Sequence, residues 1–203
     1  MAAKLRLNPA PLLMAGEQYL TFDNATGLLA KVNKVGNRKM VVADSKPLWS
    51  FELEFLARSG FWQDLAATSI GATALTSGSA TTFNVTYAGS VWSDILTWTL
   101  TIPNTNAAPI SSFALSNTMS GQTITITFPT ALAASTAHTI VIDCQAWTVT
   151  RSQNGATYDF TGSFPLLYGP AGQVNAMSAT LTPASGTATG CTISGSVTPR
   201  WIL

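Results

Sequence analysis

Charged side chains are scarce in this sequence of 203 residues, because Lys, Arg, Asp and Glu together make up only 9 % of it. An average soluble domain has roughly 25 %. The net charge is +1, so there is no excess of one sign that would favour nucleic acid or an anionic membrane as a partner. A chain this poor in charge is a membrane protein, a secreted protein with a polar uncharged surface, or a subunit whose surface is covered by partners.

Long apolar runs are also missing. No stretch reaches the about 18 apolar residues of a membrane-spanning helix, because Thr, Ser, Gly and Pro interrupt every run. At the N-terminus, Asn8, Pro9 and Pro11 break what would be the hydrophobic segment of a signal peptide. The strand-like segments are too short for an outer-membrane barrel, whose strands have about ten residues. We therefore expect neither membrane insertion nor secretion by a signal peptide.

Cysteine and histidine are nearly absent. Cys144 and Cys191 are too few for a disulfide framework. Two buried thiols are the expected state, and a bridge is the alternative for an extracellular chain. His138 is the one histidine, and no CxxC or HxxxH spacing occurs, which argues against a zinc site. We expect no metal and no cofactor.

No arrangement of residues predicts catalysis. Nucleophilic catalysis needs a base beside the nucleophile, whereas His138 stands at the start of a predicted strand, where a strand-end role is favoured over that of a base. Glu52 and Glu54 share one face of one predicted strand and are interpreted as a solvated pair, not as the paired carboxylates of a glycosidase. No Gly-rich phosphate loop joins a strand to a helix. We expect that the protein is not an enzyme.

What the sequence does have is alternation of apolar and polar residues with a period of two. It is clearest in residues 49–55, 96–102 and 124–128, where aromatic or aliphatic residues alternate with Thr, Ser or Glu, as in a half-buried strand. Weaker strands are predicted at 19–22, 28–33, 39–43, 83–87, 110–116, 139–143, 147–151, 157–160, 174–181 and 191–197. Segments 68–80 and 183–190 are rich in small residues and are expected to be loops. Short strands at this spacing predict an all-β fold, an antiparallel β-sandwich or barrel.

The alternation also predicts the core of the sandwich. The expected core residues are Phe51, Leu53, Phe55, Trp98, Leu100, Ile124, Ile126, Ile140, Ile142 and Val149. Trp49, Trp98 and Trp147 lie in the alternating segments and are expected on core faces. Trp62, Trp92 and Trp201 are less patterned, which makes them candidates for contact with a partner.

Charge is distributed unevenly along the chain. Residues 1–64 contain fourteen of the nineteen charged side chains, and strong alternation starts near Lys46-Pro47. We therefore predict an N-terminal arm or β-hairpin extension at 1–46 and a sandwich domain at 47–203. The rival interpretation is that segment 19–43 adds strands to the same sandwich.

The first part of the chain contains the other candidates for contact between subunits. They are Leu5, Leu12, Leu13, Lys31, Lys34, Arg38 and Lys39. The leucines belong to a segment with no strong strand or helix pattern, which can dock as an extended arm on a neighbouring subunit. The basic residues form either a solvated hairpin around Gly36-Asn37 or a patch that pairs with acidic residues of a neighbour.

Four segments, taken in order, resemble the distal tail proteins of siphophages, the long-tailed bacteriophages. The first is WSFELEFLARSGFWQDL at 49–65, with its aromatic pair Phe61-Trp62. The next is the apolar strand and hairpin return of 139–150, followed by Asn154-Gly155. Segment 164–172 comes third, with its apolar residues and Pro-Gly-type turn, and Arg200-Trp201, two residues before the last residue, comes fourth. The resemblance covers about residues 47–203.

The resemblance implies a galectin-like jelly roll and the role of a structural virion protein at the tail tip. Such proteins form homo-oligomeric rings, commonly hexamers, that join the tail tube to the tip and its receptor-binding components. The implied partners are further copies of the chain and other phage tail proteins, with assembly in the host cytoplasm and no catalytic residues. Residues 1–46 then correspond to a reduced ring-forming region. The alternative function is a carbohydrate-binding β-sandwich module of a receptor-binding or adhesin protein, which would bind sugar as a small oligomer.

Overall fold

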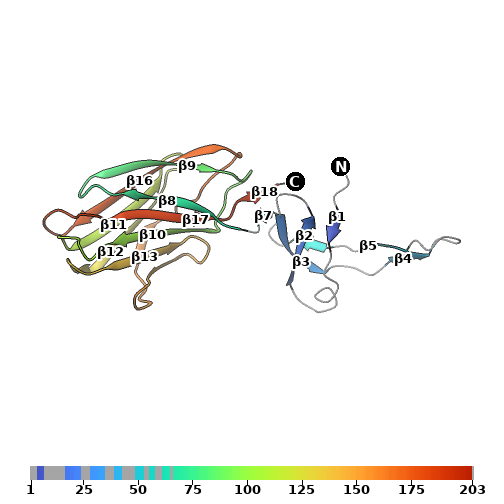
Figure 1. Cartoon of the computed structure of the whole chain (residues 1–203), viewed down its shortest axis with the longest axis horizontal. Coiled ribbons are helices and arrows are strands. Elements are labelled where there is room, and N and C mark those ends of the chain that lie inside the picture. The colour runs from blue at the N-terminus through green and yellow to red at the C-terminus, as the bar shows by residue number, and fades with distance from the viewer. Residues whose placement is uncertain are drawn as a thin grey trace. The chain divides into compact units, whose positions relative to one another are not determined.

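The structure, a computed structural model, describes residues 61–64 and 66–202, together with the backbone of six strands before them. These six are β1 (Lys4–Arg6), β2 (Glu17–Asp23), β3 (Leu28–Lys34), β4 (Lys39–Val42), β5 (Trp49–Glu52) and β6 (Phe55–Ala57). The described residues form strands, turns and loops only (Figure 1). None of them belongs to a helix long and apolar enough to cross a membrane.

The chain divides into two compact units. Unit 1 comprises Met1–Leu65 and Arg200–Leu203, and unit 2 comprises Ala66–Pro199. This division differs from the predicted boundary at residue 46. The reason is strand pairing, because β5 pairs with β4 and β6 pairs with β3, so that both strands belong to unit 1.

Unit 1 contains a six-stranded antiparallel sheet and a separate β4–β5 pair. The sheet runs in the order β1-β2-β3-β7-β18, where β7 is Trp62–Asp64 and β18 is Arg200–Trp201, and β6 also pairs with β3. Because β7 precedes unit 2 in the sequence and β18 follows it, unit 2 is an insertion between two paired strands of unit 1. The rival interpretation, that segment 19–43 adds strands to the sandwich, is therefore wrong, because the strands of this segment belong to unit 1.

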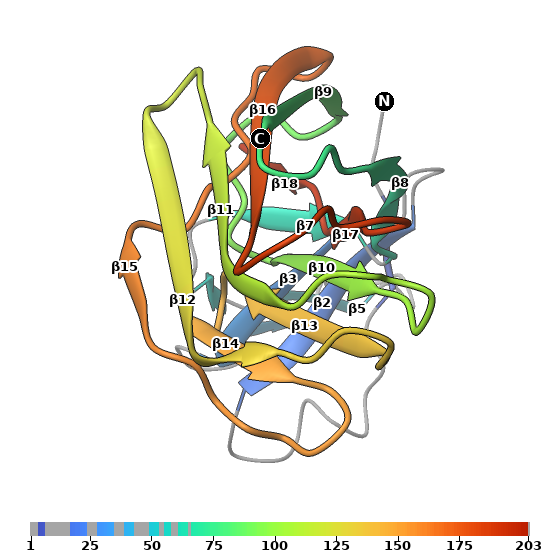
Figure 2. The same cartoon turned by 90° about the vertical axis from the view of Figure 1, so that its left-hand side faces the viewer.

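Unit 2 is an antiparallel sandwich of two five-stranded sheets, which confirms the predicted fold class. One sheet has the order β14-β13-β10-β17-β8, and the other has the order β15-β12-β11-β16-β9. In Figure 2 β8, β17, β10 and β13 follow one another along one layer, and β9, β16, β11 and β12 follow one another along the other. The strands are β8 (Thr68–Ala74), β9 (Ala80–Tyr87), β10 (Leu96–Ile102), β11 (Ile110–Asn117), β12 (Gln122–Leu132), β13 (His138–Asp143), β14 (Thr148–Arg151), β15 (Phe160–Gly162), β16 (Gln173–Pro183) and β17 (Thr192–Val197).

The core lies between the inward faces of these two sheets, where the alternation placed it. On one sheet Trp98 lies opposite Ile142 and Leu100 lies opposite Ile140. The predicted core residues Trp98, Leu100, Ile124, Ile126, Ile140, Ile142 and Val149 are all at most 1 % exposed. Trp98 also donates its indole N–H to the carbonyl oxygen of Pro165 at 3.3 Å, so its one polar group has a partner. These core predictions are confirmed.

Other parts of the core prediction were wrong. Phe51 and Phe55 belong to β5 and β6 of unit 1 and not to the sandwich, while Leu53 lies outside the described residues. Trp147 is 62 % exposed, because it precedes β14 in a turn where its φ is 57°. Such a backbone conformation ends the alternation on which the prediction rested.

Segment 68–80 is not simply a loop, because β8 occupies its first half. β8 is the edge strand of its sheet and pairs with β17. The residue of β8 that packs against the core is Ile70. A single apolar side chain gives no period-two signal, so the sequence TSIGATA was misread as a loop. The loop predicted at 183–190 is confirmed, since β16 ends at Pro183 and β17 begins at Thr192.

Candidate interaction sites

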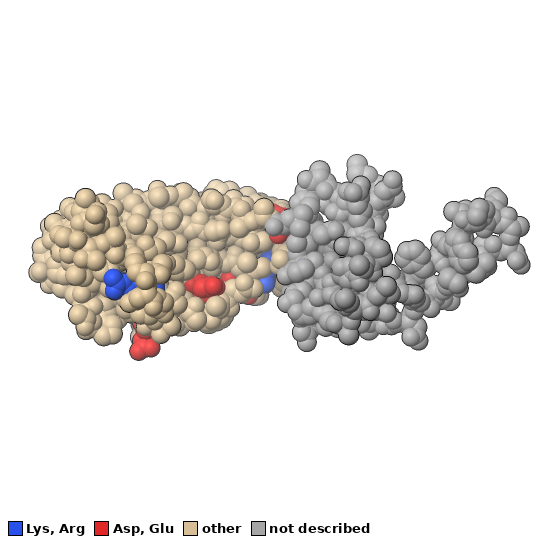
Figure 3. Space-filling model, turned by 60° about the horizontal axis from the view of Figure 1, so that its bottom comes forward, with Lys and Arg blue, Asp and Glu red and all other residues tan. Residues whose placement is uncertain are grey.

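The surface of the sandwich is almost uncharged. Ala66–Pro199 contains four charged side chains, namely Asp94, Asp143, Arg151 and Asp159. Threonine takes the outward positions of the central strands, for example Thr99 on β10 and Thr125 on β12. On the face that Figure 3 shows, charged atoms of the described residues form only small isolated patches. Partners of this surface would meet hydroxyl and small apolar groups.

Large apolar side chains are exposed at several turns of the sandwich. Trp92, a candidate for partner contact, is 39 % exposed between β9 and β10. Trp147 is exposed at the turn between β13 and β14, and Met119 at the turn between β11 and β12. The ring of Trp147 packs edge-on against Phe164, with 5.4 Å between the ring centroids. These side chains offer apolar area outside the core.

The two other candidate tryptophans meet within unit 1. Trp62 on β7 and Trp201 on β18 lie directly opposite each other in the strand pair. The indole N–H of Trp201 donates to Oδ1 of Asp64 at 2.9 Å. The guanidinium group of Arg200 lies over the ring of Phe61, 5.7 Å from its centroid. The residues of unit 1 that precede and follow the inserted sandwich in the sequence are therefore in contact with one another.

The structure places only some of the candidates in the first part of the chain. Leu5 lies in β1 and pairs with Phe22 of β2, so it belongs to the sheet of unit 1 and not to an extended arm. Lys31 and Lys34 lie in β3 and Lys39 lies in β4. The predicted hairpin around Gly36-Asn37 is wrong, because β3 pairs with β2, β6 and β7, whereas β4 pairs with β5. Leu12, Leu13 and Arg38 lie outside the described residues.

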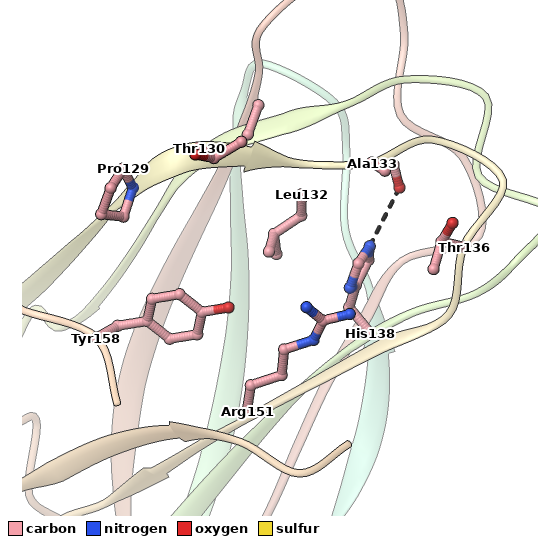
Figure 4. Close-up of a pocket in the computed structure, with 9 residues that line it drawn as sticks. Pro129, Thr130, Leu132, Ala133, Thr136, His138, Arg151 and Tyr158 are labelled. Carbon is pink, nitrogen blue, oxygen red and sulfur yellow. Dashed lines mark hydrogen bonds between the residues drawn. The ribbon is translucent and has the colours of Figure 1, made fainter. Parts of the chain in front are cut away.

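A hollow of about 420 Å³ opens on the sandwich (Figure 4), and no residue pattern in the sequence predicts it. We call it the Arg151 hollow. It is lined by residues 129–133 at the end of β12 and by Thr136, His138, Arg151 and Tyr158. The two sheets both contribute, since β12 belongs to one and β13 and β14 belong to the other. The hydroxyl end of Tyr158 points toward the side where Arg151 and Leu132 lie.

The imidazole of His138 has a defined hydrogen-bonding pattern in this hollow. The side chain is only 3 % exposed, and its Nε2 lies 3.1 Å from the carbonyl oxygen of Ala133. Because that oxygen can only accept, Nε2 carries the proton. Burial lowers the pKa of His138, the bond to Ala133 opposes this, and the positive charge of Arg151 lowers the pKa further. His138 is therefore neutral at pH 7, and its Nδ1 is a hydrogen-bond acceptor.

The register of the β13–β14 hairpin explains how Arg151 reaches His138. Arg151 pairs with Ile140 at the end of β14, two residues from His138 at the start of β13. The hairpin itself was predicted from residues 139–151. The predicted hairpin could therefore have indicated that the two residues are neighbours, although not that the end of β12 closes the hollow above them.

The thiols offer no reactive group. Cys144 and Cys191 are free and buried, which confirms the predicted pair of buried thiols and excludes the bridge between them. Burial raises the pKa of both, and for Cys144 the charges of Asp143 and Asp94 add to the effect. Within the described part of the chain, no group of three or more His, Cys, Asp or Glu residues could hold a metal ion.

Comparison of this chain with protein-family models, curated proteins and solved structures gives no match. The features of the molecule that bear on its function are the surface of the sandwich, the strand pairing of unit 1 and the Arg151 hollow.

Proposed function

We propose that the protein is a non-catalytic structural subunit that assembles with copies of itself into a ring at the tail tip of a long-tailed bacteriophage. The uncharged surface of the sandwich is the observation that carries this proposal. Four charged side chains on the whole of Ala66–Pro199 are few for a surface that faces water. The buried centres of protein interfaces are depleted of Lys, Glu and Asp. A sandwich whose surface is covered by other tail proteins has little need of surface charge.

The strand pairing of unit 1 supports the resemblance to distal tail proteins. Two of the segments that carry the resemblance are the aromatic pair at 61–62 and Arg200-Trp201 near the C-terminus. Trp62 and Trp201 lie opposite each other in paired strands, so these two segments form one structural element. This agrees with an organisation in which unit 1 forms the ring and the inserted sandwich projects toward other tail proteins.

The separation of charge between the units fits the same division of roles. Charged residues that lie across an interface fix the register of subunits more than they add affinity. The charge-rich sequence of residues 1–64 suits contact between copies of the chain. In this proposal the ring, commonly a hexamer in the resembling family, joins the tail tube to the tip and is assembled in the host cytoplasm.

Electron micrographs of the purified full-length chain would test the proposal. We expect closed rings with one rotational symmetry, because a head-to-tail contact that closes generates a ring. Deletion of residues 1–16 removes β1 from unit 1 and leaves the sequence of the sandwich intact. The deletion is expected to reduce the number of rings. Particles of single-subunit size in the full-length sample would contradict the proposal.

A further inference from the structure

The sandwich has four edge strands, and three of them are protected against pairing with another chain. β14 has four residues and ends in the charged Arg151. Its outer side is also covered, because the backbone N–H of Tyr158 donates to the carbonyl oxygen of Val149 at 2.9 Å. β15 has only three residues, and a register shift against β17 interrupts β8. Short length, charge and irregular register are means by which proteins protect the edges of their sheets.

β9 has none of these protective features. Its eight residues read ATTFNVTY and include no charged residue and no proline. All eight pair with β16 in one unbroken register. Among the described residues β9 is the last strand of its sheet, beside β16 (Figure 2). Because a long, regular and uncharged edge is the kind that pairs with a further strand, β9 is the open edge of the sandwich.

The backbone groups that β9 offers at this edge follow from the hydrogen bonds of β16. The carbonyl oxygens of Ala176 and Ser178 accept hydrogen bonds from the side of β11. Residues along an antiparallel strand alternate in the neighbour to which they are bonded, so the odd-numbered residues of β16 bond to the odd-numbered residues of β9. The even-numbered residues Thr82, Asn84 and Thr86 therefore direct their N–H and carbonyl groups to the open edge.

The side chains of β9 suit pairing with an identical antiparallel strand. A two-fold axis through Asn84 places Phe83 opposite Val85 of the second copy, on the inward face of the sheet. The same axis places Thr82 opposite Thr86 of the second copy, on the outward face. Pairs of an aromatic with a β-branched residue and pairs of threonines are favourable across strands. Phe83 is only half-buried where it packs against the core, so part of its ring is left for this contact.

From these observations we propose that β9 binds β9 of a second copy of the chain, so that one sheet of the sandwich continues from one copy into the other. The absence of charge favours an identical partner, because self-pairing brings like charges together on any charged edge. The contact is isologous, with the same surface on both copies. It goes beyond the proposed function, which assigns the ring contact to unit 1 and requires no contact between two sandwiches.

Amide hydrogen exchange on the full-length protein would test this pairing. The N–H groups of Thr82, Asn84 and Thr86 face water when the edge is open and are hydrogen-bonded when it is paired. We expect these three amides to exchange slowly, as do the odd-numbered amides of β9 that bond to β16. Fast exchange of the three amides beside slow exchange of the odd-numbered ones would overturn the proposal.

Asn84→Pro and Asn84→Ala form a matched pair of variants. Both remove the amide side chain, but only the proline also removes the N–H that points to the open edge, and it takes no bond from β16. We expect the amides of Thr82 and Thr86 to exchange at least about tenfold faster in Asn84→Pro than in Asn84→Ala, because the two bonds donated at the axis are lost. Equal exchange in the two variants would overturn the proposal, and thermal unfolding checks that the proline variant is folded.

Chemical cross-linking of Asn84→Cys would identify what occupies the edge. The two natural cysteines are buried, so a short bismaleimide reacts with the new thiols, which the two-fold axis holds close together. We expect a covalent dimer linked at position 84 of both copies. Thr101→Cys is the control, since Thr101 is exposed on β10 in the middle of the other sheet, and it should give little dimer. Slow exchange in β9 without the link at position 84 would mean that another segment covers this edge, which would overturn the assignment to a second copy.

These results are separate from the test of the ring. Closed rings with fast exchange at the three amides would overturn the β9 pairing and leave the ring proposal intact. Slow exchange and the covalent dimer in a sample without rings would support the pairing and contradict the ring.

Discussion

The side-chain amides of Asn117 and Asn175 are joined by a hydrogen bond in the interior of the sandwich, where Nδ2 of Asn117 donates to Oδ1 of Asn175 at 3.0 Å. Both residues are fully buried, one on β11 and the other on β16. Asn117 also donates to the carbonyl oxygen of Leu166 at 2.8 Å. Asn175 accepts from the backbone N–H of Tyr168 at 3.0 Å and donates to its carbonyl oxygen at 3.1 Å. The two amides therefore attach segment 166–168 to the sheet.

We expect Asn175→Ala to lower the free energy of unfolding by about 1–3 kcal/mol, because it removes the partner of the buried Asn117 amide and of two part-buried backbone groups of Tyr168. Asn84→Ala is the matched control, since Asn84 is exposed on β9, and it should change stability by less than about 0.5 kcal/mol. Urea unfolding of both variants gives the comparison. In the double variant with Asn117→Ala the two losses should not add, because they share one bond; full additivity would contradict the network.

Truncation of Trp98 tests the packing of the core. Trp98 is fully buried, so Trp98→Ala is expected to cost about 3–5 kcal/mol of unfolding free energy. Trp147→Ala removes the same ring from an exposed position and keeps the unfavourable φ of the backbone. It loses mainly the contact with Phe164, about 0.5–1.5 kcal/mol. Thermal or urea unfolding would contradict this assignment if the two variants were equally destabilised.

The buried thiols predict a loss of stability at alkaline pH. The folded state raises the pKa of Cys144 and Cys191 above the ordinary value of 9.0. Above pH 9.0 the unfolded chain releases these protons and the folded chain keeps them, so each thiol lowers the unfolding free energy by up to about 1.4 kcal/mol per pH unit. Urea unfolding at pH 8 and pH 10 would measure the loss. It should be smaller in the variant with both cysteines changed to alanine, and an identical loss would contradict the assignment.

Removal of residues 200–203 tests the role of β18 in unit 1. The truncation deletes the strand that pairs with β7, the bond from Trp201 to Asp64 and the contact of Arg200 with Phe61. Amide hydrogen exchange should become faster in β7, while the central strands of the sandwich keep their protection. A chain that lacks only residues 202–203 retains both residues of β18 and is the control. Unchanged exchange in β7 of the longer truncation would contradict the role of this strand pair.

The sequence predicted the sandwich wherever its strands have two different faces. The alternation of Leu96 to Ile102 predicts the limits of β10, because every second side chain enters the core. Alternation gives the faces of a strand but not its partner. The strong pattern at 49–55 was therefore assigned to the sandwich, although those strands pair within unit 1.

The Arg151 hollow could not be predicted from the sequence either, because it also depends on which strands become neighbours. His138 and Arg151 are thirteen positions apart and become neighbours through the register of the β13–β14 hairpin. The hollow also needs the end of β12, which arrives from the other sheet. Pairing between sheets depends on packing and not on local pattern, so no motif in the sequence marks this site.

The solution mass of the purified full-length chain is the most direct test of assembly. Sedimentation equilibrium over a range of protein concentrations would give it without reference to shape. We predict one predominant species whose mass is a whole-number multiple, greater than one, of the 21.3 kDa chain. A mass of 21.3 kDa at every concentration would contradict the proposal that the protein acts as an assembling structural subunit.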